Sequence, residues 1–527
     1  MAEPADVAAV RRWLADGGEI AFLDVREEGQ HGAGHPLLAV NLPYSRLELD
    51  VRRLVPRLAC RIVLVDDGDG VAERAARRLA AIGYTSVHIL AGGVAAWEDA
   101  GHRLFPSINV PSKGFAEIVE HDSRTPHIGA AELDRRRRAG EKLVVLDSRT
   151  VEEFNRFHVP GAITCPGAEL VLRFADLVPD PDTLVVVSCA GRTRSIIGAQ
   201  SLINAGVPNR VVSLSGGTQG WRLSGLDLER DTRDSLRPVS AAAVAAARPR
   251  AERVARRFGV RTIDRNTLAA WQGDAQRTTC LLDVRTPEEY AAGHLAGSVS
   301  APGGQLVQAI DRWVGTRGAR LVLIDDTGVR AVMTAHWLQQ MGWDVQVLDR
   351  ALESATLVRG EAEEGPAELP ALDPIEPDEA ARWLAAGAAA VCLGSSAAYR
   401  RQHPQDAVWA IRPRLGQLPH SALAARRLVL FADDEDIARC AAIDLREYST
   451  ATIAAARGGA AAWLAAGLPA ASTPDDPPDE ACIDYVFWNH DRHAGNETAM
   501  LAYLTWETEL PAQIAAERLS GFRLAAG

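Results

Sequence analysis

One sequence pattern occurs four times along this 527-residue chain, and the repetition limits the possible folds more than any other feature. The first copy has an apolar run ending in Asp24-Val25-Arg26, a second apolar run at 62–65, and Gly92-Gly93 shortly before Trp97. Related first runs begin near residues 144, 281 and 390, and the last of these copies is the weakest. Repetition at this spacing predicts tandem modules of one fold.

Each copy alternates short β-branched strands with helical patterns rich in Ala, Leu and Arg. This alternation predicts an α/β fold in which each module has a central, mostly parallel sheet flanked by helices. The predicted modules cover residues 1–104, 125–232, 258–358 and 373–470, and a C-terminal helical extension covers 471–527. We expect a Pro/Ser/Gly-bearing linker at 105–125, a helical connector at 230–257 and an acidic, proline-rich linker at 359–376.

Composition excludes several classes of protein. A chain with 47% hydrophobic and 24% charged residues is typical of a globular protein, and a net charge of −12 argues against nucleic-acid binding. No apolar run reaches membrane-spanning length and the N-terminus does not resemble a signal peptide, so the expected location is cytoplasmic. The seven cysteines show no C-x-x-C spacing, so neither a zinc site nor a disulfide framework is indicated. No metal or organic cofactor is expected.

The second copy carries a cysteine where an apolar strand stops abruptly. Residues 184–187 read as a buried central strand, and 196–203 have helical spacing, so Cys189 lies in a strand-to-helix turn. Backbone N–H groups and the helix dipole favour negative charge at such a turn, and Arg192 and Arg194 add positive charge, so we expect a stabilised thiolate. The alternative is a buried, inert cysteine. The polar loop around Cys189 favours a nucleophile.

Three motifs in the second copy resemble those of rhodanese-type sulfurtransferases. The Cys189 loop resembles the active-site loop of this family, residues 158–162 (His-Val-Pro-Gly-Ala) resemble its His-x-Pro-Gly-Ala turn, and 212–217 with Trp221 resemble its closing strand and Gly-Gly turn. The resemblance implies four rhodanese-like modules.

The resemblance also implies an activity and a set of site residues. A Cys189 persulfide would take sulfur from a small anionic donor, thiosulfate or a similar persulfide, and pass it to a thiol or cyanide, including a protein thiol. The Cys189 loop lacks the pattern associated with mercaptopyruvate enzymes, and the length of this loop favours sulfur over phosphate chemistry. The substrate-binding candidates are Arg149, Ala190, Gly191, Arg192, Thr193, Arg194 and Ser195. The alternative role for Arg149 is a buried ion pair with Asp147.

Alignment of the apolar runs places Cys189 opposite Asp67, Asp326 and Asp433, so one module is expected to be catalytic. Cys165 is a candidate second thiol. A multi-module scaffold and a sulfur carrier with little turnover of free small molecules are the alternatives to an enzyme.

The segment 482–497 is dense in aromatic and titratable residues and does not repeat. We expect it to dock on another module, with His490, Arg492 or His493 near the Cys189 site or a module interface. A His490/His493 metal pair is the alternative. A helix is expected at 499–519.

Overall fold

A computed structural model describes residues 2–353, 355–360, 369–493 and 495–524, without the side chains of Trp488, Asn489 and His493. The chain divides into two compact units. Unit 1 comprises residues 1–13, 20–108 and 364–487, and unit 2 comprises 14–19, 109–363 and 488–527. The first and fourth modules therefore belong to unit 1, and the second and third to unit 2.

The second module has a five-stranded, entirely parallel sheet in the order β11-β9-β12-β13-β8. Its strands are β8 (His127–Ile128), β9 (Leu143–Asp147), β11 (Ile163–Thr164), β12 (Leu184–Ser188) and β13 (Val211–Leu214). Its helices are α7 (Ala130–Arg138), α8 (Val151–Arg156), α9 (Glu169–Leu177), α10 (Thr193–Ala205) and α11 (Gly217–Leu223). Because β12 is central, the residue after it lies in the middle of the carboxyl edge of the sheet.

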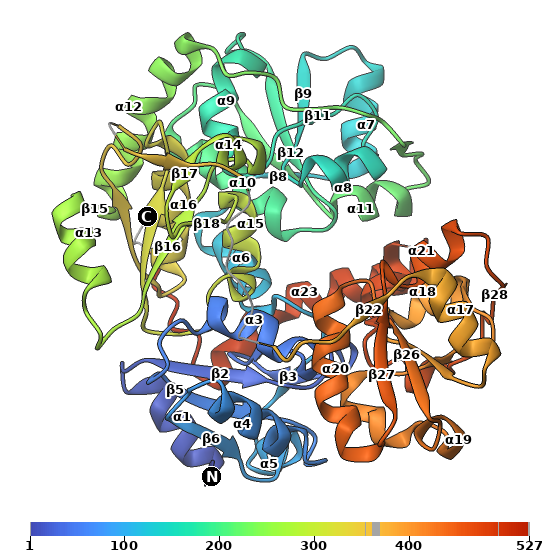
Figure 1. The fold of residues 1–527 in the computed structure, drawn as a ribbon. Coiled ribbons are helices and arrows are strands. Elements are labelled where there is room, and N and C mark those ends of the chain that lie inside the picture. The colour runs from blue at the N-terminus through green and yellow to red at the C-terminus, as the bar shows by residue number, and fades with distance from the viewer. Residues whose placement is uncertain (1, 354, 361–368, 494, 525–527) are drawn as a thin grey trace. The chain divides into compact units, whose positions relative to one another are not determined.

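The other three modules repeat this strand order, with helices flanking each sheet (Figure 1). The first has β1 (Glu3–Ala5), β2 (Ile20–Asp24), β4 (Val40–Asn41), β5 (Arg61–Val65) and β6 (Val87–Leu90). The third has β15 (Arg261–Ile263), β16 (Thr279–Asp283), β18 (Val299–Ser300), β19 (Arg320–Ile324) and β20 (Asp344–Leu348). The fourth has β22 (Pro374–Ile375), β23 (Ala389–Cys392), β25 (Val408–Trp409), β26 (Arg427–Phe431) and β27 (Thr452–Ala456). The predicted α/β fold of four modules is confirmed.

Helices follow the strands of these modules in the expected alternation. The first module contains α1 (Val7–Ala15), α2 (Glu28–Ala33), α3 (Leu47–Leu54), α4 (Val71–Ala81) and α5 (Gly93–Asp99). The third contains α13 (Arg265–Gln272), α14 (Pro287–Ala292), α15 (Gly303–Gln308) and α16 (Val329–Gln340). The fourth contains α17 (Pro377–Ala385), α18 (Ser396–Arg401), α19 (His420–Leu423), α20 (Glu435–Tyr448) and α21 (Gly459–Ala465).

A short antiparallel strand pair closes each module: β3 (His35–Pro36) with β7 (Leu104–Phe105), β10 (Phe157–His158) with β14 (Glu229–Arg230), β17 (His294–Leu295) with β21 (Leu357–Val358), and β24 (His403–Pro404) with β28 (Ala470–Ala471). Each pair contains a buried histidine that stacks at 3.7 Å on the ring four residues earlier. In the second module this residue is His158, whose Nδ1 lies 2.9 Å from the carbonyl oxygen of Phe154. The repeated histidine is therefore part of the packing.

The predicted linker at 105–125 is wrong, because most of it is helix α6 (Val110–Ser123). Proline and glycine suggested a loop, but Pro111 stands in the first turn, where its missing N–H costs nothing. Gly114 allows close packing of α23 (Glu497–Glu517): a Cβ there would lie 2.1 Å from Cδ1 of Ile514. The prediction of the helix at 499–519 is confirmed by α23.

The expected helical connector before the third module is confirmed as α12 (Ala241–Phe258), which buries Ala243, Ala247, Ala251 and Val254. Part of the predicted linker at 359–376, residues 361–368, lies outside the described residues. Within the described part of the chain, no helix is long and apolar enough to cross a membrane.

A buried ion-pair cluster joins the two modules of unit 1. Arg412 of the fourth module is 2% exposed, and its guanidinium contacts the carboxylates of Glu48 and Asp444. Its Nη2 donates to Oε1 of Glu48 at 2.9 Å. Burial acts to raise the pKa of Glu48, but Arg412 and Arg78 outweigh it and lower this pKa to about 2.

We expect Arg412→Leu to lower the free energy of unfolding of unit 1 by about 3–5 kcal/mol, because it removes the ion pair of buried Asp444 and leaves buried Glu48 with Arg78 alone. The matched change Arg457→Leu, which removes a half-exposed pair with Glu376, should cost at most about 1 kcal/mol. Urea unfolding of the full chain measures both. Because the pKa of Glu48 is lowered, the difference between the variants should be complete above pH 4.5 and shrink as the pH falls toward 2. Equal urea midpoints for the two variants would contradict this role.

Candidate active site

Strand β12 delivers Cys189 to the carboxyl edge of the second sheet. Val185, Val186 and Val187 are fully buried in the strand, and α10 begins four residues after Cys189, at Thr193. Cys189 is only 2% exposed. The predicted strand-to-helix turn is therefore present, with the thiol enclosed.

The predicted equivalence of Cys189 with Asp67, Asp326 and Asp433 is wrong by one residue. Cys189 is the first residue after the central strand of its module. The first residues after the central strands of the other modules are Asp66, Asp325 and Ala432, which are therefore its counterparts. The alignment was shifted because three of the central strands begin with arginine where β12 begins with Leu184. An alignment of apolar runs starts those three strands one residue later, after the arginine. None of the counterparts is a cysteine.

The Gly-Gly turn supports this alignment of Cys189 with its counterparts in the first and fourth modules. A Cβ on Gly217 would lie 2.2 Å from the carbonyl oxygen of Cys189, so only glycine allows this contact. Gly93 approaches the carbonyl oxygen of Asp66 in the same way, and Gly459 that of Ala432.

Backbone N–H groups hold a carboxylate at this position in the first module. Asp66 accepts hydrogen bonds from the N–H groups of Gly68 and Ala72, both at 2.9 Å. The corresponding donors in the second module are the N–H groups of Gly191 and Ser195. The loop therefore has an anion-binding backbone independently of the cysteine.

The third module repeats the arrangement with one more donor. Asp325 accepts hydrogen bonds from the N–H groups of Thr327, Arg330 and Ala331 at 3.3, 2.8 and 3.3 Å. Arg330 is the counterpart of Arg194, since Arg330 stands five residues after Asp325 and Arg194 five residues after Cys189.

The ionisation of Cys189 differs from the expectation. Burial raises the pKa of this thiol above its ordinary value, although Arg194 and hydrogen bonds from Ser195 act to lower it. The contributions of Arg194 and of the loop at Ser195 are thus present, but desolvation outweighs them in this closed site. The expected net lowering of the pKa is corrected.

The positive charges that Arg192 and Arg194 add to the loop are paired with acidic side chains. Arg192 forms ion pairs with Glu117, at 2.7 Å, and Glu120 on α6. Arg194 binds both carboxylate oxygens of Glu153, at 2.6 and 2.7 Å. Sequence proximity to Cys189 did not reveal these acidic partners.

Arg149 adopts the geometry of the ion-pair alternative. Its guanidinium contacts Asp147 at 2.8 Å and the carbonyl oxygen of Phe157 at 2.6 Å, and its side chain is 1% exposed. Arg26 and Arg285 form the same pair with the aspartate two residues earlier in modules that lack the cysteine. The pair therefore belongs to the framework of the module, and donor binding by Arg149 stays a prediction.

The C-terminal helix α23 covers the loop, although the docking hypothesis concerned the preceding segment 482–497. At the position of a Cβ on Gly191, Oε2 of Glu507 would lie 3.3 Å away and Cε1 of Tyr503 3.4 Å away. The hydroxyls of Thr193 and Tyr503 donate to Oε1 of Glu507 at 3.3 and 2.7 Å. The sequence predicted a helix at 499–519 but did not place its residues Tyr503 and Glu507 at the site.

The residues singled out before α23 lie in different surroundings. The guanidinium carbon of Arg492 lies 3.5 Å from the ring centre of Tyr503, so Arg492 is close to the site. His490 is exposed, and the side chain of His493 is outside the described ones. Among the described residues, no group of three or more His, Cys, Asp or Glu side chains is placed to hold a metal ion.

All seven cysteines are buried and none forms a disulfide. Cys165, the candidate second thiol, packs in the apolar core with Leu146 and Val187, and burial strongly raises its pKa. These surroundings favour a packing role.

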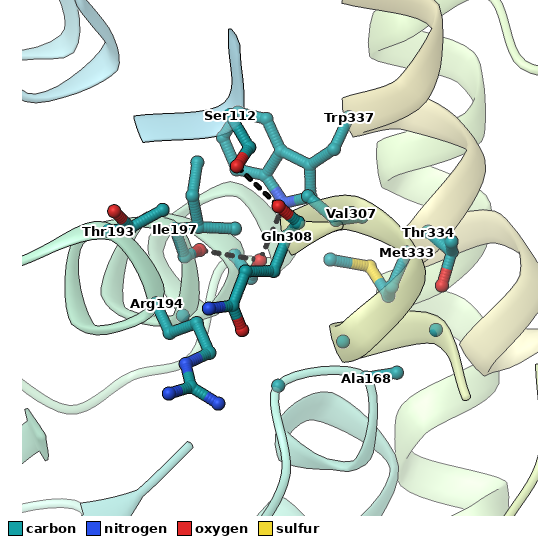
Figure 2. A pocket seen from close by; sticks show the side chains of 15 residues that line it. Ser112, Ala168, Thr193, Arg194, Ile197, Val307, Gln308, Met333, Thr334 and Trp337 are labelled. Atoms are coloured by element: carbon teal, nitrogen blue, oxygen red, sulfur yellow. Dashed lines mark hydrogen bonds between the residues drawn. The ribbon is translucent and has the colours of Figure 1, made fainter. Parts of the chain in front are cut away.

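A cavity of about 30 Å³ lies behind the loop, where α6, α10, α15 and α16 meet (Figure 2). Ile197, Val307, Met333 and Trp337 line it, and the hydroxyl of Ser112 donates to the carbonyl oxygen of Gln308 at its edge. A space of this volume holds about one water molecule, so it is no substrate site.

The fold and the loop define a protein of repeated parallel α/β modules, one of which encloses a cysteine in the strand-to-helix turn where two other modules hold an aspartate. The chain belongs to the rhodanese-like domain family: the family model of the rhodanese-like domain matches residues 6–100, 129–224 and 264–356, more than half of the sequence. These stretches are the first three modules, and the fourth shares their strand order.

The crystal structure of a thiosulfate sulfurtransferase from Pseudomonas aeruginosa is 44% identical, with a TM-score of 0.94, and the match covers 99% of this chain and 100% of that one. An HTH-type transcriptional regulator of Mycobacterium tuberculosis is 39% identical over 19% of this chain and 44% of its own length. A putative sulfur carrier protein of Bacillus subtilis is 28% identical over 21% of this chain and 57% of its own length. The chain thus spans about half the length of these two curated relatives.

The opposing effects on Cys189 lead to a prediction about its reactivity. We expect Arg194→Met to slow alkylation of Cys189 by iodoacetamide at pH 8 by about tenfold or more, because losing a nearby positive charge raises the thiol pKa further. The matched control Arg192→Met should change the rate little, because Arg194, and not Arg192, is the arginine whose charge mainly acts on the pKa of Cys189. Intact mass against time, repeated over a range of pH, measures both rates. An unchanged pH profile in Arg194→Met would refute this effect.

Proposed function

We propose that this protein is a sulfurtransferase in which Cys189 carries the sulfur. The Cys189 thiolate attacks the outer sulfur of thiosulfate, a new S–S bond forms, and the original S–S bond breaks with its electron pair leaving on sulfite. An acceptor thiolate or cyanide then attacks the outer sulfur of the Cys189 persulfide and regenerates the thiolate. The products are a new persulfide or thiocyanate.

The single observation that carries this proposal is that backbone N–H groups bind an aspartate carboxylate at the position of Cys189 in the first and third modules. An aspartate oxygen stands two bonds beyond Cβ, as does the outer sulfur of a cysteine persulfide. The N–H groups that hold Asp66 and Asp325 therefore correspond to donors, on Gly191, Arg194 and Ser195, that would hold the terminal sulfur of a Cys189 persulfide. Preorganised N–H groups stabilise such an anion without rearrangement.

The donor is proposed as thiosulfate or a related persulfide. Similarity over the whole chain to the thiosulfate sulfurtransferase of Pseudomonas aeruginosa supports thiosulfate. Because Glu117, Glu120 and Glu153 neutralise the loop arginines, the backbone N–H groups are the main positive feature that such an anion would meet at Cys189.

A sulfur carrier is the second candidate, favoured by the burial of Cys189 and by the similarity to the putative sulfur carrier protein of Bacillus subtilis. A carrier would take its sulfur from a protein persulfide and would turn over free donors slowly. The chemistry at Cys189 is the same in both cases.

The decisive measurement is intact mass after incubation with thiosulfate. We expect the wild-type chain and Cys165→Ser to gain the mass of one sulfur atom and to lose it on addition of cyanide. Cys189→Ser should gain nothing. The Cys165 variant is a matched control because it removes another buried thiol of the same module.

No gain with thiosulfate, mercaptopyruvate or glutathione persulfide would reject sulfur transfer at Cys189 and leave the scaffold alternative. A gain that depends on Cys189 without steady-state formation of thiocyanate would favour the carrier.

A further inference from the structure

A second cavity, of about 100 Å³, adjoins the Cys189 loop within unit 2. Helix α11 borders both of them: the N–H of Thr218 donates to the carbonyl oxygen of Cys189 at 2.8 Å, and that of Gln219 to the carbonyl oxygen of Ala190 at 3.1 Å. The side chains of Thr218, Gln219 and Arg222 line this cavity together with Arg230 and Arg492. It is therefore attached directly to the backbone that holds the cysteine.

Two side chains of this cavity carry buried polar atoms without internal partners. Gln219 is 4% exposed, yet neither its amide nitrogen nor its amide oxygen has a hydrogen-bond partner among the described residues. The buried Nε of Arg222 likewise has none there. Buried polar groups are almost always satisfied, so an unsatisfied set around a cavity indicates that water or a ligand binds there.

Two arginines of the cavity bring positive charge that no carboxylate compensates. Arg222 and Arg230 form no ion pair within the part of the chain that the structure describes, unlike Arg149, Arg192 and Arg194. The neighbouring carboxylate of Glu229 is directed to His158, with 3.3 Å between Oε2 and Nε2. A guanidinium presents a planar pair of donors that matches a carboxylate.

This polar set accompanies the cysteine. The Gly-Gly turns align the modules, and the counterparts of Thr218, Gln219 and Arg222 are Val94, Ala95 and Glu98 in the first module and Ala460, Ala461 and Leu464 in the fourth. These two modules, which have no thiol at the end of the central strand, therefore lack the amide and the guanidinium.

We infer that this cavity is a carboxylate subsite for an organic thiol or persulfide that exchanges sulfur with Cys189. The inference rests on the proposed function and extends it to a class of substrate. Thiosulfate carries its charge on the group bonded to the transferred sulfur, so it has no use for a second, separate oxyanion site. A thiol with a carboxylate on the same molecule uses both sites.

The test uses butyrate, in which a methyl group replaces the thiol of 3-mercaptopropionate, to protect Cys189 of the full chain from iodoacetamide. Butyrate should slow alkylation of the wild type, whereas 1-butanol should not. In Arg222→Met the protecting concentration should rise about tenfold or more, as expected for loss of a charge-assisted hydrogen bond. The matched control Arg210→Met removes an exposed arginine at the opposite end of β13 and should behave as the wild type.

Gln219→Leu, similar in shape and uncharged, provides a second variant in case Arg222→Met does not fold, and it should also weaken protection. Equal protection in these variants and the wild type, or none in the wild type, would overturn the subsite. Alkylation needs no sulfur transfer, so its outcome is separate from that of the mass experiment. If Cys189 does form a persulfide, Arg222→Met should reduce kcat/KM for 3-mercaptopropionate about tenfold and leave that for 3-mercapto-1-propanol unchanged.

Discussion

The backbone N–H groups at the end of the central strand are the feature on which the rest of the site depends. A parallel strand followed at once by a helix leaves these donors directed at one point, and a negative group satisfies them. Asp66 and Asp325 supply that group from within the chain, whereas the second module presents Cys189. A change at one position therefore distinguishes a loop filled by a carboxylate from one that carries a thiol, without altering the fold.

Charge compensation explains why the surroundings of Cys189 differ from those suggested by its neighbours in sequence. A buried guanidinium needs a carboxylate, and Arg192 and Arg194 find theirs on α6 and at the start of α8. Helix α23 then encloses the loop through residues distant in sequence, with Thr193 and Glu507 separated by 314 positions. The resulting desolvation opposes ionisation of the thiol. Arg222 and Arg230, which have no carboxylate partner among the described residues, lie instead in the adjoining cavity, beside Gln219.

The pairing of buried guanidinium groups with carboxylates also connects the modules within each compact unit. In unit 2, Arg330 of the third module reaches Glu169 of the second at 2.9 Å while it also binds Asp325. In unit 1, Arg412 has the corresponding role between the fourth and first modules. Helices α6 and α12 add apolar contacts within unit 2, through Phe115 and Ala247 among others. The modules without the cysteine thus have a structural function within their units.

The sequence by itself determined the α/β fold, the four modules and the strand-to-helix position of Cys189, because these depend on local periodicity and on the residues that a tight turn tolerates. It did not determine the register of the central strands, since hydropathy cannot distinguish a strand that begins with Arg61 from one that begins one residue later. Nor did it show that the segment at 105–125 is helical, because the burial of α6 against α23 stabilises it. Only the tertiary structure decided which carboxylates neutralise the arginines, that Glu507 and Tyr503 cover the loop, and that Gln219 and Arg222 line a cavity beside it. These are contacts between residues far apart in the chain, and local sequence carries no record of them.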